Sequence, residues 1–435
     1  MPYPPVITAD RHCTRRAFCL STLATAFGLA GPLRAAPPPT GTHNPRLATL
    51  DHLMQSFIDD HNVPGAALAV TRGPRLVYAR GFGYADVEER IPVQPVSLFR
   101  IASISKPFTA VAILHLAAGG RLRLTDRVRD LIKLKPLQED GLREDPRLKK
   151  VTILQLLRHT GGWDRAQSFD PMFRPIVIAR ACHVRPPAGQ TQIIRYMFGR
   201  PLDFDPGVRY AYSNFGYCLL GEVIREVTQQ PYEKYVQEQI LRPLGIHGMR
   251  LGHTLTQAPG EVRYYDMQRR TAPAVVGNIG RQVPLPYGAW FLEAMDSHGG
   301  WIASAIDLVR FARAFNDPNR CPVLGRPGIA TMFSRPPGLA GFQSDGSPRD
   351  GYYGCGWQVR TVDRPGRFSS WHAGSLAGTS TLLVRRFDGF NWAVLFNSQT
   401  GVGGKLLSGI IDPLIHHAVD SVRAWPAHDL FPKYE

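Results

Sequence analysis

Residues 99–110 read Phe99-Arg-Ile-Ala-Ser103-Ile-Ser-Lys106-Pro-Phe-Thr-Ala110 and place a serine three positions before a lysine. If a helix runs through this stretch, positions i and i+3 share a face, so the Ser103 hydroxyl lies within reach of the Lys106 amine. A serine hydroxyl is a weak nucleophile until a neighbouring base takes its proton. A Ser-x-x-Lys string alone also fits a capping serine beside a solvated lysine. The choice therefore depends on the rest of the chain.

Two further motifs lie downstream. Tyr212-Ser-Asn214 supplies a tyrosine and an asparagine two residues apart, and in an extended or loop conformation their side chains project the same way. His372-Ala-Gly374-Ser375 precedes a strand-like segment at 379–384. With these two motifs present, a nucleophilic serine explains the sequence better than a capping serine does.

The three motifs, in this order, resemble the active-site elements of the serine β-lactamase and penicillin-binding protein family, in particular its class C branch with the related esterases and D-amino-acid amidases. Two flanking stretches, Leu156-Leu-Arg-His-Thr-Gly-Gly162 and Gly299-Gly-Trp-Ile-Ala-Ser304, resemble recurrent segments of the same family. The resemblance runs from about Leu47 to about Ser398. It implies an acyl-transfer enzyme that works through a covalent intermediate and needs no metal or organic cofactor.

The resemblance also implies a role for each motif residue. The catalytic residues would be Ser103, which attacks the carbonyl, and Lys106 and Tyr212, which move its proton and protonate the leaving group. The substrate-binding and oxyanion positions would be Asn214, His372, Gly374 and Ser375. Asn214 would also hold Lys106. The backbone N–H groups of Ser103 and Ser375 would form the oxyanion hole.

The third motif departs from the family's usual Lys-Thr-Gly, because its first two positions are His372 and Ala373. A lysine charge with a neighbouring hydroxyl suits the carboxylate of penicillins and D-Ala-D-Ala ends, whereas histidine is mostly neutral near pH 7 and alanine donates nothing. Gly374 still permits close approach of a strand to a substrate. The departure favours an esterase or amidase over a β-lactamase or D-Ala-D-Ala carboxypeptidase. A third interpretation is a non-catalytic protein that binds penicillin or cell-wall peptides, and the intact serine, lysine and tyrosine argue against it.

Apolar patterning predicts an α/β fold of the α+β type. Leu47–Ile58 has one apolar face at helical spacing, and two apolar runs at 65–70 and 76–79 indicate a β-hairpin. Further strands are expected at 356–359, 379–384 and 392–396, and helices at 107–118, 153–158, 216–227 and 305–315. We expect the N- and C-terminal strands to form one antiparallel sheet flanked by helices. A mainly helical insertion, roughly 107–340, would form a second lobe, with the site in the cleft between them.

Residues 1–36 indicate an export signal of the twin-arginine type, because Arg15 and Arg16 precede an uncharged stretch and small residues follow at Ala35 and Ala36. The uncharged stretch is shorter than the ~20 apolar residues that a spanning helix needs. We therefore expect export to the periplasm or the medium and no stable membrane span after signal removal. A linker would follow at 37–45 and one hydrolase domain at 46–435.

The formal charge of +16 is spread over scattered Lys and Arg residues, so it favours anionic surroundings without identifying a partner. The sequence has no nucleic-acid-binding motif and no Cys/His metal spacing. We expect a small ester, amide or β-lactam-like substrate. Cys218 lies in an apolar run and is expected to be a buried free thiol. His159 is expected to line a turn or the wall of the cleft rather than act as a base.

Overall fold

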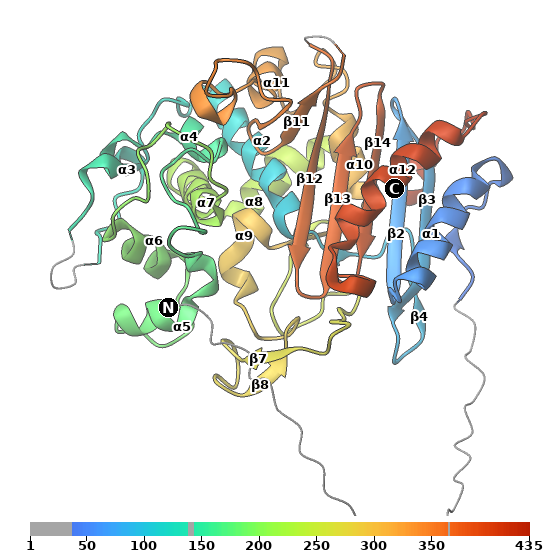
Figure 1. Ribbon diagram of the computed structural model, residues 1–435, viewed down its shortest axis with the longest axis horizontal. Coiled ribbons are helices and arrows are strands. Elements are labelled where there is room, and N and C mark those ends of the chain that lie inside the picture. Colours follow the sequence, from blue (N-terminus) through green and yellow to red (C-terminus); the bar gives the residue numbers. More distant parts are fainter. Residues whose placement is uncertain (1–36, 138–142, 364–365) are drawn as a thin grey trace, which may run out of the picture. The chain divides into compact units, whose positions relative to one another are not determined.

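The computed structural model describes residues 37–137, 143–363 and 366–435. Over these ranges it contains the antiparallel sheet that was predicted, with strand order β1-β3-β2-β14-β13-β12-β11-β10 and β4 paired to β3 (Figure 1). The strands are β1 Thr40–Gly41, β2 Gly65–Arg72, β3 Arg75–Asp86, β4 Ile91–Pro92, β10 Gly351–Tyr353, β11 Gln358–Thr361, β12 Phe368–Leu376, β13 Thr379–Arg385 and β14 Phe390–Phe396. The predicted export signal lies outside the described residues.

The centre of the sheet joins the two ends of the chain. The predicted hairpin is present as β2 and β3, and Gly73 in its turn has a φ of 57°, which glycine adopts without strain. On its other edge β2 pairs with β14, with Ala66 opposite Phe396. The Asn391 side chain donates a hydrogen bond of 2.9 Å to the Thr71 hydroxyl, 320 residues away in sequence. N- and C-terminal strands therefore form one sheet, as the sequence suggested.

One central strand was missed from the sequence. The segment at 379–384 that follows His372, Gly374 and Ser375 is strand β13, as predicted, but these three residues themselves lie inside another strand, β12. Serine, histidine and glycine residues give β12 little of the β-branched bias that marks a strand. Its position comes from pairing with β11 and β13 on both sides.

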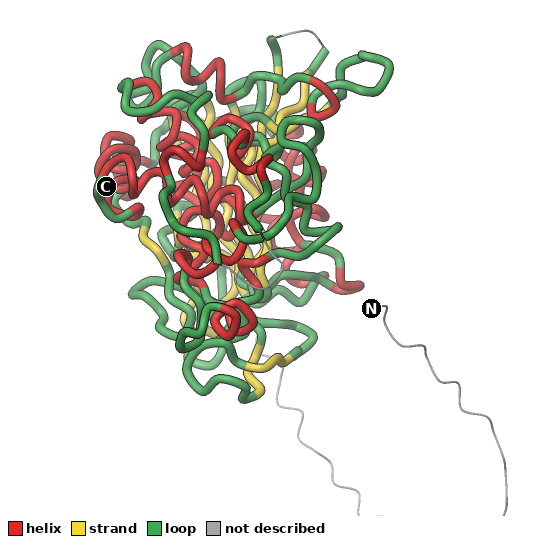
Figure 2. The backbone as a smooth tube through the Cα atoms, turned by 90° about the vertical axis from the view of Figure 1, so that its left-hand side faces the viewer, coloured by secondary structure: helices red, strands yellow, loops and turns green. Residues whose placement is uncertain are grey.

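Helices cover both faces of the sheet. α1 (Ala48–Asp60) and α12 (Leu407–Ser421) lie in front of the strands in Figure 1, and their apolar side chains share a core with the sheet. α10 (Ala305–Arg313) packs on the other face, and it begins with a capping box formed by Ser304 and Asp307. Figure 2, viewed from the helical side, shows most of the remaining helices in front of the strands.

The remaining α-helices lie between β5 and β10 in sequence. They are α2 Ser105–Ala118, α3 Val128–Leu131, α4 Ile153–Leu157, α5 Pro175–Ala181, α6 Gln190–Phe198, α7 Asn214–Thr228, α8 Tyr232–Val236, α9 Asp296–Gly299 and α11 Arg326–Met332. This region also holds two small sheets, β5-β9-β6 (Phe99–Arg100, Trp301–Ala303, Arg250–Leu251) and β7-β8 (Thr271–Pro273, Gln282–Pro284). The domain boundaries proposed from sequence stay a prediction.

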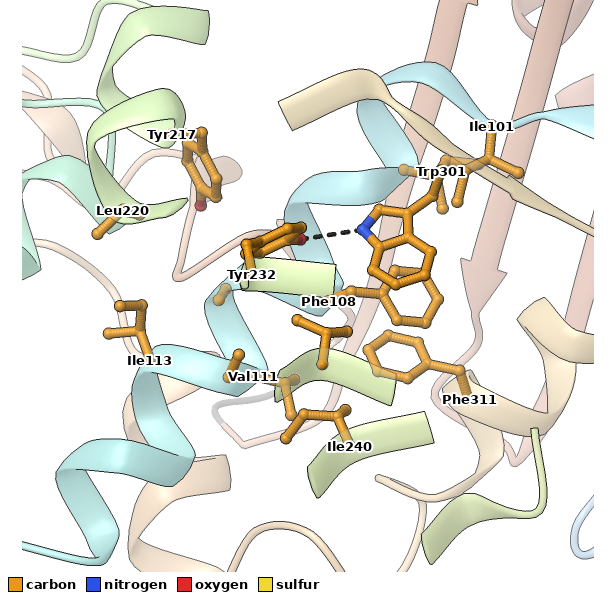
Figure 3. Packing of buried hydrophobic residues seen from close by; sticks show 14 of the residues in the cluster. Ile101, Phe108, Val111, Ile113, Tyr217, Leu220, Tyr232, Ile240, Trp301 and Phe311 are labelled. Atoms are coloured by element: carbon orange, nitrogen blue, oxygen red, sulfur yellow. Dashed lines mark hydrogen bonds between the residues drawn. The ribbon is translucent and has the colours of Figure 1, made fainter. Parts of the chain in front are cut away.

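α2 runs through the main core, and most of its side chains are buried, which is typical of a helix surrounded by protein. Phe108 stacks on Phe311 with ring centroids 3.9 Å apart (Figure 3). Nearby, Trp301 Nε1 donates a hydrogen bond of 3.0 Å to the Tyr232 hydroxyl (Figure 3). The stacking of Phe108 on Phe311 packs α2, the helix that carries Lys106, against α10.

Two further findings concern the described part of the chain. None of its helices combines the length and the apolar character required to cross a membrane. Cys218 is a buried free thiol in α7, as expected, and burial raises its pKa.

Candidate active site

Ser103 lies at the entry to α2. It is the middle residue of a short 3₁₀ turn, Ala102–Ile104, that leads directly into the helix, and it is partly exposed. Ala102 has a φ of 45°, an uncommon conformation for a residue with a Cβ, and it is buried against Trp290 and Leu376. Backbone strain of this kind persists where packing enforces it, and it is frequent at functional sites.

The structure brings Ser103, Lys106 and Tyr212 together. Lys106 Nζ lies 3.1 Å from Ser103 Oγ, and the Tyr212 hydroxyl lies 2.8 Å from the same oxygen. Tyr212 comes from the loop before α7 and is 109 residues from Ser103 in sequence. Burial raises the pKa of Tyr212, so its phenol keeps its proton at neutral pH.

Lys106 is fully buried and is held on three sides. Besides Ser103, Nζ contacts Asn214 Oδ1 and the His298 carbonyl oxygen, both at 2.8 Å. Burial holds the pKa of Lys106 well below its usual range, although the charge of Asp170 opposes this shift. The two carbonyl oxygens can only accept, so they take two N–H groups. A neutral amine then directs its lone pair at Ser103.

Asp170 belongs to this site, although no sequence pattern pointed to it. Its Oδ2 accepts a hydrogen bond of 2.7 Å from Asn214 Nδ2. A carboxylate can only accept, so this contact orients the amide and turns Asn214 Oδ1 toward Lys106. Asp170 also accepts from the Met172 N–H at the start of a 3₁₀ helix, Pro171–Phe173. From sequence alone, the Asp-Pro pair indicates only a turn.

His159 forms part of the wall beside Tyr212, as predicted, and it also holds the backbone on both sides of that residue. The Ala211 N–H donates to the His159 carbonyl at 2.9 Å, and the Ser213 N–H donates to His159 Nδ1 at 3.2 Å. Nδ1 is therefore an acceptor, and the ring proton lies on Nε2. Burial lowers the pKa of His159 far below its usual value, and the nearby Lys106 adds to this, so the ring stays neutral.

His372 lies near this cluster but turns no free nitrogen toward a substrate. It is 4% exposed, and its Nδ1 contacts the Ala373 carbonyl oxygen at 2.8 Å. A carbonyl only accepts, so Nδ1 carries the proton and Nε2 accepts from the Tyr353 hydroxyl at 2.9 Å. Burial lowers the pKa of His372 to about 3, so this strand presents a neutral ring where the family usually has a charged lysine.

Gly374 and Ser375, two neighbouring positions of β12, make different contacts. A Cβ on Gly374 would lie 2.1 Å from the Ile101 carbonyl oxygen, so the glycine allows close approach to the backbone just before Ser103. The close approach of this strand to a substrate stays a prediction. The Ser375 hydroxyl accepts from Gln399 Nε2 at 3.0 Å. This hydroxyl is thus engaged by Gln399, and the role predicted for Ser375 in the oxyanion hole belongs to its backbone N–H.

In the described ranges, no three or more His, Cys, Asp or Glu side chains lie close enough to hold a metal ion. The groups in contact with Ser103 Oγ are an amine and a phenol, and an amide holds the amine. Together they can move a proton to and from a serine oxygen, which is the requirement for nucleophilic catalysis.

The similarity of this chain to known proteins covers most of its length and is not confined to the site residues. The chain is 27% identical over 349 residues to Penicillin-binding protein 4* of Bacillus subtilis (strain 168), covering 78% of this chain and 69% of that protein. The D-amino acid amidase of Ochrobactrum anthropi SV3 shares the fold with a TM-score of 0.65 at 21% identity, covering 86% of this chain and all of that one. The structure described as "EstCE1, a hydrolase with promiscuous acyltransferase activity" has the same score and identity, covering 86% and 98%.

The chain spans about two thirds of the length of the curated relatives it matches. At 21% identity the two solved structures show the fold alone. A sequence model of the Beta-lactamase family matches residues 50–408, a range that contains the Ser103 cluster and nearly the whole sheet. On this match the chain belongs to the Beta-lactamase family, whose members include penicillin-binding proteins, amidases and esterases.

Proposed function

We propose that this protein is a serine hydrolase that cleaves esters or amides through an acyl-enzyme on Ser103. The observation that carries the proposal is the contact of one serine oxygen with both a buried amine and a phenol, at 3.1 and 2.8 Å. A serine placed in this way has a base for its own proton and an acid for a leaving group.

In the proposed reaction, Ser103 Oγ bonds to the substrate carbonyl carbon while its proton passes to the neutral Lys106 amine. The resulting ammonium is stabilised by Asn214 Oδ1 and the His298 carbonyl oxygen. When the bond to the leaving group breaks, Tyr212 gives its proton to that group and regains one from Lys106. Water then enters, and the same groups act in reverse to release the acid. The backbone N–H groups of Ser103 and Ser375 are the proposed oxyanion donors.

The third motif favours an esterase or amidase over a β-lactamase or D-Ala-D-Ala carboxypeptidase. Its histidine is neutral and has both ring nitrogens engaged, and Ala373 offers no hydroxyl. No side chain at these positions can therefore pair with the carboxylate of a penicillin or a peptide end. The alternative of a non-catalytic binding protein does not explain why Ser103, Lys106 and Tyr212 are all in contact.

The test is intact-protein mass spectrometry after exposure to a fluorophosphonate, to penicillin and to an activated short-chain ester, with Ser103→Ala as the control. We expect fluorophosphonate labelling at Ser103, rapid ester hydrolysis and no lasting penicillin adduct, with nitrocefin left intact. A long-lived penicillin adduct would identify a penicillin-binding peptidase instead. Turnover retained in Ser103→Ala would refute the mechanism.

A further inference from the structure

A second cavity lies at the C-terminal end of α10. Its volume is about 470 Å³, which is within the usual range for small-molecule sites in proteins. The last turn of α10 contributes Arg310 and Arg313, and the other lining residues come from the turn between β2 and β3 and from segments 243–244 and 314–322. Among the described residues that line this cavity, none belongs to the Ser103 cluster. The cavity is therefore separate from the candidate active site.

Arg310 is an almost buried cation whose hydrogen-bond donors are unused. Its side chain is 7% exposed, and its ion pair is with Glu435, whose side chain is 64% exposed. Nη1 and Oε1 of this pair are 3.6 Å apart, and within the described ranges Arg310 donates no hydrogen bond. A guanidinium carries five N–H groups, and burying charged donors without acceptors costs free energy. An anion in the cavity would supply the missing acceptors.

The positive charge of Arg310 is also close to that of Arg313. Both guanidinium carbons lie 4.3 Å from the centre of the Phe431 ring. Burial lowers the pKa of Arg313, and the charge of Arg310 adds to this, although two nearby carboxylates oppose it. The carbonyl end of α10 attracts cations, which accounts for arginines in its last turn. That attraction provides no acceptor for the Arg310 N–H groups, and a bound anion would.

The protein holds these charges in place without a ligand. Arg313 Nη1 donates a hydrogen bond of 2.6 Å to the Pro74 carbonyl oxygen in the turn between β2 and β3. Phe431 is buried, and the residue before it is fixed to β3, because the Leu430 N–H donates to the Leu76 carbonyl at 2.9 Å. A site formed in advance binds without the entropy cost of ordering its own side chains.

The rest of the cavity determines what kind of anion fits. Four of its lining residues are apolar: Pro74, Pro243, Leu244 and Pro322. Ligand sites typically combine such walls with a few polar groups that fix the orientation of the ligand. A further cation, Arg320, is 88% exposed and has its own partner in Asp317, with Nε and Oδ2 3.6 Å apart. The cavity therefore suits a molecule with an apolar body and an anionic group.

We propose that Arg310 and Arg313 form a binding site, separate from Ser103, for a small organic anion. The ligand would have an apolar body against the proline walls and one sulfonate, phosphate or carboxylate group on the two guanidiniums. This inference does not depend on the proposed function, because it uses no residue of the Ser103 cluster.

The test compares 2-naphthalenesulfonate with its uncharged counterpart, 2-naphthalenesulfonamide, by calorimetry on the whole protein. We expect the sulfonate to bind more tightly and Arg310→Gln to raise its Kd about tenfold, the loss expected for one charge-assisted contact. Arg313→Gln should cause a similar loss, and it keeps the test decisive if Arg310→Gln does not fold. Equal affinity for the two probes, or no binding of the sulfonate, would overturn the inference.

Two controls check the site and the ligand class. Arg320→Gln removes an exposed, paired charge from the same cavity, so we expect the Kd of the sulfonate to stay within about twofold of wild type. Equal losses in Arg320→Gln and Arg310→Gln would attribute binding to general electrostatic attraction and would overturn the site. Inorganic phosphate should bind at least about tenfold more weakly than the sulfonate, because it leaves the apolar walls uncovered. Equal affinity for phosphate would refute the apolar body.

A last measurement separates this cavity from the candidate active site. Protein labelled on Ser103 with a fluorophosphonate should bind the sulfonate with the Kd of the unlabelled protein. Loss of binding after labelling would place the probe beside Ser103 and would overturn the inference. If Ser103 does not react at all, the proposed function fails, but the dependence of binding on Arg310 still decides whether this second site exists.

Discussion

Replacing Gly374 by alanine tests how β12 sets the position of the nucleophile. The new Cβ would lie 2.1 Å from the Ile101 carbonyl oxygen and 2.3 Å from Thr381 Oγ1. Neither atom can easily move away, because Thr381 Oγ1 itself donates to the Ile101 carbonyl at 3.1 Å. The strand and the segment before Ser103 must therefore separate. Overpacking of this kind costs about 1–3 kcal/mol.

The loss of activity should exceed the loss of stability. At roughly 2–4 °C per kcal/mol for large domains, we expect Tm to fall by several degrees. Displacement of a reacting group by about 1 Å can cost on the order of 100-fold in rate, so the rate of fluorophosphonate labelling should fall by that order. Gly409→Ala is the control, because its Cβ meets nothing within 4 Å. Normal labelling and an unchanged Tm in Gly374→Ala would refute the proposed role of this contact.

Two further predictions concern the groups behind the nucleophile. Asp170→Asn removes a negative charge that raises the pKa of Lys106, so more of the amine is neutral at a given pH. The acid limb of the pH profile of kcat/KM should move to lower pH, and a move to higher pH would contradict a neutral Lys106 base. His159→Asn places an amide oxygen near the position of Nδ1 and tolerates the residue's φ of 56°, whereas His159→Gln places its amide near Nε2. We expect kcat to fall far less in the Asn variant, because it keeps an acceptor for the Ser213 N–H beside Tyr212. Equal kcat values in the two folded variants would show that this hydrogen bond does not position the phenol.

Local patterns predicted the parts of the fold that local forces determine. The β2–β3 hairpin has apolar runs on either side of a glycine turn, and α1 has a single apolar face. Both elements can therefore be recognised from a short stretch of sequence. β12 is different, because its serines, histidine and glycine become a strand only through pairing with β11 and β13. A strand of this kind carries too little side-chain signal to be found without its neighbours.

The same distinction applies to the site. The contact between Ser103 and Lys106 follows from their spacing of three residues, so the sequence could predict it. The contact of Asp170 with Asn214 spans 44 residues, and that of His159 with Ser213 spans 54. Each is a hydrogen bond made after the chain has folded back on itself. No spacing rule within one helix or strand predicts such a contact.

The pairing of β2 with β14 has a consequence for synthesis on the ribosome. β2 is largely buried in the folded protein. During synthesis, however, the edge that pairs with β14 stays unpaired until Phe390–Phe396 has been translated. An unpaired apolar edge can join other chains, and pairing across so much sequence is slow to form. The nascent chain also lacks the contact between Gly374 and Ile101 until β12 emerges. Covalent labelling of Ser103 should therefore report completion of the whole chain, although the residues that contact its oxygen lie in the first half.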